Sequence, residues 1–428
     1  MKPTRILTSI GVALATGALL TLSAVAGGIS LYEIGTPDIG LASAGYSARA
    51  QDASTLFKNP AGMSLLSGPQ VQGGLQFLYG NVEFSKNSRT STASPDLGSD
   101  NGGNAVGALP GASFFITYPI TERLTAGFGT FSYFGLAVDF HNDWVGRYYA
   151  QEGTLLGMTL MPAVSFKVND WLSIGGGLNA MYGYLHSEVA VRNVVGSDGQ
   201  LKLDDEEWGF GGIGGVIITP REGTRLGVTY ISQVDLDFSD KPSIKGLNFP
   251  LNAVAILNNP PTLDLSVTVP QMVMFGIYQE INTNWAVMAD VGWQNWSQFG
   301  AVEVTVNSDT PTSLTKNLHY NDTWHGAIGA QYTASEHWQF SGGFAYDTSA
   351  VSDANRTLLL PLGEAYRFGL GALWKYSKNL DFGAAYEFAW TGDLPTTQGQ
   401  PGDYRGEVSG SFRDVWFSFF TMNLTWRF

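Results

Sequence analysis

The chain contains no cysteine among its 428 residues. This absence excludes a disulfide framework, a thiolate metal site and a cysteine nucleophile. Charged residues are also scarce, since they make up 14% of the sequence and an average soluble domain has roughly 25%. After the N-terminal region no run of about 18 or more apolar residues occurs, so a membrane-spanning helix is not expected.

The N-terminal region has the pattern of a secretory signal. Lys2 and Arg5 provide a basic start, residues 6–22 are apolar or small, and residues 24–26 form a small-x-small cleavage site. We therefore expect residues 1–26 to be a signal peptide and the mature chain to be exported. Its removal takes two basic residues and no acid from a chain of formal net charge -14, and such an acidic protein is not expected to bind nucleic acid.

Alternating hydrophobicity is abundant, and it is clearest at the C-terminal end. Every second residue there is large and apolar, namely Phe428, Trp426, Leu424, Met422 and Phe420, whereas the residues between them are polar, namely Arg427, Thr425, Asn423 and Thr421. A period of two indicates a β-strand with one apolar and one polar face. In a chain with 13% aromatic residues and 53 glycines, this pattern is typical of an outer-membrane β-barrel.

Short polar turns alternate with long polar connections along the chain. The six short turns lie at residues 118–122, 168–170, 219–223, 282–284, 334–336 and 377–379, and the seven long connections at 87–108, 137–153, 191–206, 239–265, 307–319, 349–362 and 392–410. Strict alternation places all short turns on one side of the sheet. Residues 69–428 are therefore predicted to form an all-β, 14-stranded antiparallel transmembrane β-barrel with both ends in the periplasm.

Residues 27–68 precede the first predicted strand and lack its alternation. They are rich in glycine and alanine, which would let the segment pack tightly. A barrel of this width would be open to water if nothing filled its lumen. We therefore predict that residues 27–68 form an N-terminal hatch, or plug, inside the barrel.

Four stretches resemble, in order along the chain, the FadL/TodX-type outer-membrane transporters of long-chain fatty acids and hydrocarbons. They are residues 51–63, with the hatch-like Asn59-Pro60-Ala61, then residues 133–140, 284–297 and 322–368. The resemblance implies a lumenal hatch and passive uptake of hydrophobic molecules. Asn-Pro also begins ordinary turns, so this motif alone has a simpler interpretation.

The resemblance also implies the positions of the ligand path. It implies capture in a groove between two long external loops, whose apolar candidates are Phe140, Trp144, Tyr148, Leu247, Phe249, Leu251, Val254 and Leu257. It implies gating by the hatch residues Asn59, Pro60 and Ala61, and a lateral opening at a kink of the third strand, at Ser132, Tyr133 and Gly135. Simpler alternatives are loops that pack on each other as a cap and a glycine that is merely tolerated in a strand.

The residues leave the chemistry of the ligand open. Family members that take fatty acids carry a cation on the fifth strand, whereas residues 180–191 contain His186 and Glu188 but no Lys or Arg. An alkane or aromatic hydrocarbon is therefore an alternative to a long-chain fatty acid. A general porin for small polar solutes and a purely structural or adhesive barrel are further alternatives, which the predicted hatch and the apolar loops disfavour.

The sequence shows no catalytic constellation. It has no Gly-x-Ser-x-Gly elbow, and the adjacent His186 and Ser187 point to opposite faces of a strand. The five histidines lack metal-ligand spacing. We therefore expect no enzyme activity, no metal and no cofactor. The expected partners are a hydrophobic small molecule and outer-membrane lipid, and the expected form is a monomer in the outer membrane of a Gram-negative bacterium.

Overall fold

The computed structural model describes residues 31–32, 34–91, 100–299, 301–307, 312–313 and 316–428. The predicted signal peptide, residues 1–26, and residues 27–30 and 33 of the predicted hatch lie outside the described residues. In the part of the chain that is described, no helix has the length and apolar character needed to cross a membrane.

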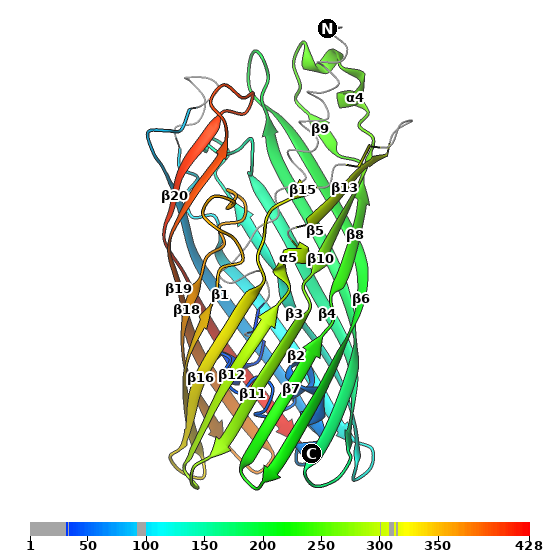
Figure 1. Ribbon diagram of the computed structural model, residues 1–428, viewed down its shortest axis with the longest axis vertical. Helices are drawn as coiled ribbons and strands as arrows, with labels where there is room; N and C mark the ends of the chain where they lie inside the picture. Colours follow the sequence, from blue (N-terminus) through cyan, green and yellow to red (C-terminus); the bar gives the residue numbers. More distant parts are fainter. Residues whose placement is uncertain (1–30, 33, 92–99, 300, 308–311, 314–315) are drawn as a thin grey trace.

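A closed antiparallel β-barrel dominates the molecule (Figure 1). Its strands are β1 (Gln70–Lys86), β2 (Gly107–Pro119), β3 (Leu124–Asp139), β4 (Glu152–Lys167), β5 (Leu172–Val191), β6 (Gly199–Arg221), β7 (Thr224–Ile231), β11 (Met272–Glu280), β12 (Trp285–Gln294), β16 (Thr323–Thr333), β17 (Trp338–Asp347), β18 (Ala365–Lys375), β19 (Leu380–Gly399) and β20 (Glu407–Arg427). Each pairs with its neighbour, and the β1–β20 and β5–β6 pairings complete the ring. The prediction of fourteen strands is confirmed.

The short turns all lie at one end of the barrel, as predicted, and the long connections lie at the other (Figure 1). Two of the long connections, residues 191–206 and 392–410, are shorter in the structure than predicted. β5 and β6 remain paired up to Val191 and Gly199, and β19 and β20 up to Gly399 and Glu407. These upper strand ends carry polar residues outward, so the apolar alternation that marks a lipid-facing strand is absent there.

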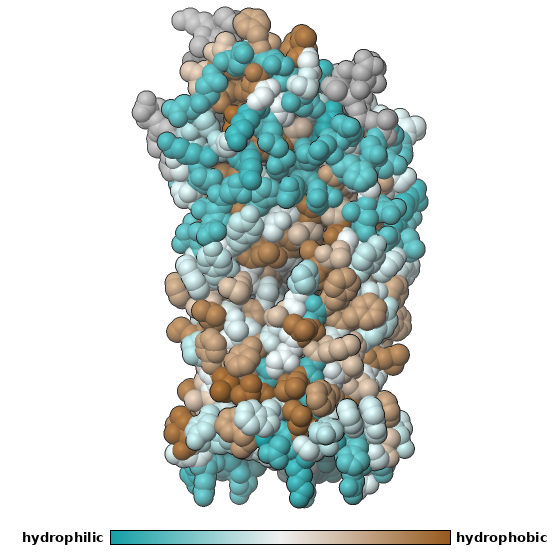
Figure 2. Space-filling view, turned by 180° about the vertical axis from the view of Figure 1, so that it is seen from behind, coloured by the Kyte–Doolittle hydropathy of each residue, from teal (hydrophilic) through white to brown (hydrophobic). Residues whose placement is uncertain are grey.

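The outer face of the barrel is apolar around its middle. On β16, for example, Trp324, Ile328 and Tyr332 point outward and are exposed, whereas His325 and Gln331 point inward and are buried. Figure 2 shows the resulting apolar belt, with hydrophilic residues above it and at the lower rim. This sorting has a physical cause, because a charge near the bilayer midplane costs roughly 2–4 kcal/mol.

A second, smaller sheet continues β7 and β11 upward. It contains β8 (Val234–Asp240), β10 (Thr262–Val269), β13 (Ala301–Asn307) and β14 (Thr312–Ser313), with β15 (Lys316–Asn317) paired to β13. β8 leaves the wall and packs on inward-facing glycines of β5 and β6, since a Cβ on Gly183 or Gly209 would meet Leu236 of β8. β8 and β10 therefore line the upper lumen with buried apolar side chains.

A short strand and several short helical elements make up the rest. β9 (Ser243–Lys245) pairs with the start of β6, and η2 (Leu251–Ala253) and α4 (Ala255–Asn258) follow it in the same long connection. α5 (Trp296–Phe299) follows β12. The N-terminal segment contains α2 (Thr36–Ile39), α3 (Thr55–Lys58) and η1 (Pro60–Leu65), and it lies inside the lower barrel (Figure 1).

Candidate functional site

The N-terminal segment is enclosed by the barrel wall. Nearly every described residue from Ile34 to Met63 is buried. The wall makes room through glycines that face inward: a Cβ on Gly227 of β7 would collide with the carbonyl of Ser47, and one on Gly343 of β17 with that of Leu41. Small residues on both sides therefore let two backbones approach closely.

Polar side chains hold this segment in place. The Asp290 carboxylate on β12 accepts hydrogen bonds from three successive backbone N–H groups, those of Gly45, Tyr46 and Ser47. Gln51 pairs with Gln331 of the neighbouring strand β16 (2.9 Å), and Thr36 pairs with Thr421 of β20, which lies farther around the barrel (2.9 Å). Anchors on several strands therefore fix the segment to the barrel wall.

Asn59 is the most connected of the predicted hatch residues. Its side-chain N–H groups donate to the carbonyl of Ser47 (2.8 Å) and to two wall carbonyls, those of Val216 (3.1 Å) and Val228 (3.3 Å). Its Oδ1 accepts from Ala61 N (3.1 Å) and caps η1, which Pro60 begins. The motif thus joins the segment to β6 and β7 and also caps the start of η1.

An ion cluster lies buried within the segment. Asp38 Oδ1 contacts Lys58 Nζ (2.6 Å) and Arg49 Nη2 (3.1 Å), and Asp52 lies 3.3 Å from Arg49 Nη1. Burial raises the pKa of Asp52, but the charges of Lys58 and Arg49 and the hydrogen bonds from Ser54 outweigh it and lower that pKa to about 2. The two carboxylates and two cations therefore neutralise one another inside the lumen.

The predicted kink in the third strand is present as a β-bulge. Ser132 pairs with Met158 and Phe134 with Gly157, so Tyr133 is the extra residue. The bulge reverses the side-chain parity of β3, and both Tyr133 and Phe134 are buried as a result. Gly135 follows at φ +156, where a Cβ would press on the Leu155 carbonyl of β4.

At the level of this bulge the pairing of β2 with β3 is interrupted, and higher up Asp139 N donates to the carbonyl of Ala105 (2.8 Å). The β2–β3 ladder spans only the pairs from Phe114–Thr130 to Pro119–Thr125, although both strands continue upward. An apolar pocket of about 120 Å³ lies at this interruption. Its lining includes Leu31 and Ile34 of the N-terminal segment, Ala112 of β2, and Ser132, Gly135 and Leu136 of β3.

The N-terminal segment contacts the bulge directly. Leu31 N donates to the Tyr133 carbonyl (2.7 Å), and the ring of Phe57 lies 5.1 Å from the ring of Tyr133 and 4.6 Å from that of Phe131. Asn179 of β5 holds the Tyr133 hydroxyl at 2.7 Å. Any movement of the segment near Leu31 must therefore change the surroundings of the bulge.

The structure places the predicted loop residues in two clusters rather than one groove. Phe140 and Trp144 stack at 3.9 Å and pack beside Phe84 and Phe412, whereas Tyr148 donates to Asp198. The residues of the other loop lie in a separate cluster with Val189, Val191 and Leu201 of β5 and β6, namely Leu247, Leu251, Val254 and Leu257. Phe249 stands apart from both clusters, with 75% of its surface exposed.

Arg367 of β18 is a lumenal cation that could serve a ligand carboxylate, but it is already paired. Arg367 contacts Asp347 of β17 (2.6 Å) and Glu387 of β19 (3.2 Å), and Asp347 also contacts His325 (2.7 Å). His186 lies on the outward parity of β5, with its neighbours Leu185 and Ser187 facing inward. The alternation along β18 places Arg367 on the lumenal face, but its two acidic partners lie on neighbouring strands and cannot be matched to it from the sequence.

A polar pocket of about 800 Å³ lies below the N-terminal segment, lined by Arg49, Asp52, Lys375, Asp381 and Arg427 among others. Its ionic walls suit water rather than an apolar ligand. The N-terminal segment therefore lies between two chemically different pockets. Ile34 lines the apolar pocket beside the β3 bulge, and Thr36 lines the polar pocket below the segment.

The fold and this site define a class: an outer-membrane β-barrel whose own N-terminal segment occupies the lumen. The chain belongs to the outer membrane protein transport protein family (OMPP1/FadL/TodX), whose model matches residues 17–428. It is 26% identical over 395 residues to a long-chain fatty acid transport protein of Salmonella typhi, which covers 86% of this chain and 89% of that protein. It is 26% identical over 414 residues to outer membrane protein P1 of Haemophilus influenzae, with 87% and 88% covered.

Solved structures share the fold. A FadL homologue of Pseudomonas aeruginosa matches with a TM-score of 0.82 at 20% identity, covering 93% of this chain and 99% of the other. The toluene transporter TodX of P. putida matches with a TM-score of 0.66 at 15% identity, covering 96% and 99%. The family membership and the barrel together make this chain an outer-membrane protein.

Proposed function

We propose that this protein lets hydrophobic molecules diffuse passively across the outer membrane, with exit through the side of the barrel. The observation that carries the proposal is the interrupted β2–β3 ladder, with an apolar pocket beside it and a polar pocket below the N-terminal segment. Each buried CH₂ is worth about 0.8 kcal/mol, so an apolar ligand gains by leaving sideways into lipid. The polar route would forfeit that gain.

In this proposal residues 27–68 act as the hatch, and Asn59, Pro60 and Ala61 hold it closed. The link between Leu31 and the Tyr133 carbonyl supports coupling between hatch and wall. Ser132, Tyr133 and Gly135 border the exit. One chain closes one complete barrel, so in this proposal a single copy is sufficient for transport.

Long-chain fatty acids are the proposed ligand class, on the names of the curated relatives. A neutral hydrocarbon is the second candidate, and a specific observation favours it. Arg367 already contacts two acidic side chains, so this cation offers little to a ligand carboxylate. Parallel uptake of a labelled long-chain fatty acid and labelled toluene would separate the two ligand classes.

The lateral exit can be tested by closing it. If the β2–β3 ladder continued upward in register, Ala112 would face Ser132, and both residues line the pocket. The native chain has no cysteine, so an Ala112→Cys/Ser132→Cys variant can be cross-linked cleanly. We expect oxidation or a short bis-thiol linker to abolish most uptake of the labelled ligand, and cleavage of the linker to restore it.

A matched control lies on the same two strands. Ile116 and Phe128 are already paired partners, on the same outward parity, so cross-linking an Ile116→Cys/Phe128→Cys variant should leave uptake unchanged. Full uptake through a cross-linked 112–132 pair would refute the lateral exit and favour passage down the lumen. Large steady single-channel conductance of the wild type would instead favour a general porin.

A further inference from the structure

Three outward-facing side chains gather on β4 and β5, above the apolar belt. On β5 the outward residues change from apolar Leu178 through Tyr182 and Tyr184 to His186 and Glu188. Aromatic residues of this kind mark the membrane interface. His186, Glu188 and Glu152 of β4 therefore lie at or just above the outer interface, on the face of the wall that points away from the lumen.

The two glutamates face each other across the sheet. Glu152 and Glu188 are direct partners in the β4–β5 ladder, and like charges in such a pair destabilise a sheet. One ligand atom from each of Glu152, His186 and Glu188 lies within 4.8 Å of the other two. A cation between them would turn this repulsion into attraction.

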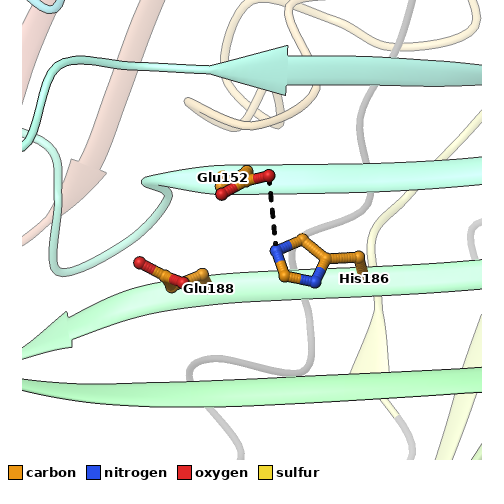
Figure 3. A group of neighbouring side chains, drawn as sticks. All are labelled: Glu152, His186 and Glu188. Carbon is orange, nitrogen blue, oxygen red and sulfur yellow. Dashed lines mark ion pairs between the residues drawn. The ribbon is translucent and has the colours of Figure 1, made fainter.

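His186 is oriented toward the two glutamates. Its Nδ1 lies 2.6 Å from Asp204 Oδ1 on β6, and only 7% of its side chain is exposed. Its buried Nε2 has no hydrogen-bond partner, and Glu152 Oε1 lies 3.5 Å from it (Figure 3). A carboxylate on one imidazole nitrogen that leaves the other available is the arrangement found behind metal-binding histidines.

The neighbouring contacts leave this arrangement open. Glu188 Oε1 accepts from Gln200 (2.5 Å) and Gln151 (3.4 Å). The nearby cation, Lys202, pairs with Asp204 Oδ2 at 3.2 Å. Lys202 is also the cross-strand partner of Glu188, so this single lysine is shared by Asp204 and Glu188, and the ion pair of Glu152 is with His186 itself.

We propose that Nε2 of His186 and the carboxylates of Glu152 and Glu188 form a Zn²⁺ site on the outer wall, with water in the remaining position. Ligands about 2.0–2.2 Å from a tetrahedral Zn²⁺ lie roughly 3.4 Å apart. The partly exposed Glu152 side chain can rotate to reach that spacing. An imidazole nitrogen favours zinc over Ca²⁺ and Mg²⁺, which prefer oxygen ligands. The histidine spacing along the sequence could not show this site, because Glu152 and Asp204 come from neighbouring strands.

The test is a titration of the folded full-length protein in detergent with Zn²⁺ alone, in competition with a chelating dye. We expect one saturable site per chain. His186→Gln and Glu152→Gln should each weaken binding by tenfold or more, and Asp204→Asn should weaken it by about tenfold to a hundredfold, as loss of a supporting carboxylate does. His337→Gln removes an exposed histidine at the opposite end and should change nothing.

A second measurement keeps the proposal testable if a variant folds poorly. X-ray absorption of the zinc-loaded wild type should show a single shell of about one nitrogen and three oxygen ligands, without sulfur, at the ordinary zinc distances. Unchanged binding by a folded His186→Gln variant would overturn the proposal, as would displacement of Zn²⁺ by equimolar Ca²⁺. Zinc binding and ligand uptake are separate measurements, because the outer-wall cluster does not line the proposed ligand path.

Discussion

At the residue scale, Asn59 has both a local role in the N-terminal segment and a long-range contact with the barrel wall. Asn-Pro in a sequence usually begins a turn, and Asn59 does cap η1. Its amide also reaches the carbonyls of Val216 and Val228 in the wall. No local pattern can show such a contact, because the partners lie more than a hundred residues away.

Changing Asn59 to Asp should loosen the segment without deleting any atom of its packing. The variant replaces two donors by acceptors that face three carbonyl oxygens. An unsatisfied buried polar group costs about 1–3 kcal/mol. We expect raised ion conductance in planar bilayers and greater entry of a small polar dye into cells than in the wild type.

The control for this change is Asn379→Asp. Asn379 is exposed in the turn before β19, and its amide donates to a single carbonyl, that of Arg427. It should leave conductance at the wild-type level. If Asn59→Asp also stays at that level while folding normally, the segment does not depend on this side chain for closure.

Sequence parity placed many single residues correctly and left their partners unknown. It put His186 and Ser187 on opposite faces of one strand and Leu424 and Thr425 on opposite faces of another, and both placements hold. It could not show that Arg367 meets Asp347 and Glu387. Strand pairing is a long-range choice, so contacts across it follow only when the register is known.

At the element scale, strands that face lipid were the most predictable. Their alternation is imposed by the bilayer, and the six short turns bound them on one side. β8 and β10 were harder to place, although both alternate, because they leave the wall at Ser232-Gln233 and Pro270 and pack inside it. A period of two shows that a strand has two faces, but not which surroundings each face meets.

The long connection between β7 and β11 separates an exposed residue from a buried one, and the two should respond differently. Phe249 is exposed, whereas Leu251 is buried against Val189 and Leu201. Phe249→Ser should lower uptake at limiting ligand by about tenfold, since an apolar side chain contributes roughly 1.5–3 kcal/mol to a contact. The fold of the connection should stay intact.

Leu251→Ser is the companion variant. Loss of its buried packing should make the connection easier to cleave by protease, while the barrel itself stays resistant. Limited proteolysis of both variants and uptake at matched surface level separate the two effects. Equal uptake by Phe249→Ser and the wild type would move ligand capture to the other loop cluster, around Phe140 and Trp144.

At the scale of the whole molecule, the architecture follows from two patterns that can be read in the sequence. Apolar side chains point outward and polar ones inward, the reverse of a soluble protein, and short turns alternate with long connections. These features predict the closed barrel and its orientation. They do not predict the upper sheet or the outer-wall Glu152–His186–Glu188 cluster, because both depend on how separate strands come together.

This inverted arrangement predicts a depth-dependent response to charge. Ile328 lies outward on β16, midway between the aromatic residues Trp324 and Tyr332, and is 62% exposed on the protein surface. Arginine there would lie near the bilayer midplane and cost roughly 2–4 kcal/mol, whereas near an interface the cost is about 0–1 kcal/mol. We expect Ile328→Arg to lower the folded, heat-modifiable fraction in outer membranes, and Ile281→Arg, in the short turn after β11, to fold like the wild type. Both residues have a similar exposed fraction, 62% and 59%, so depth in the membrane is the main difference between them. Equal assembly of the two variants would mean that lipid does not surround β16 at Ile328, and the outward assignment of this face would then be wrong.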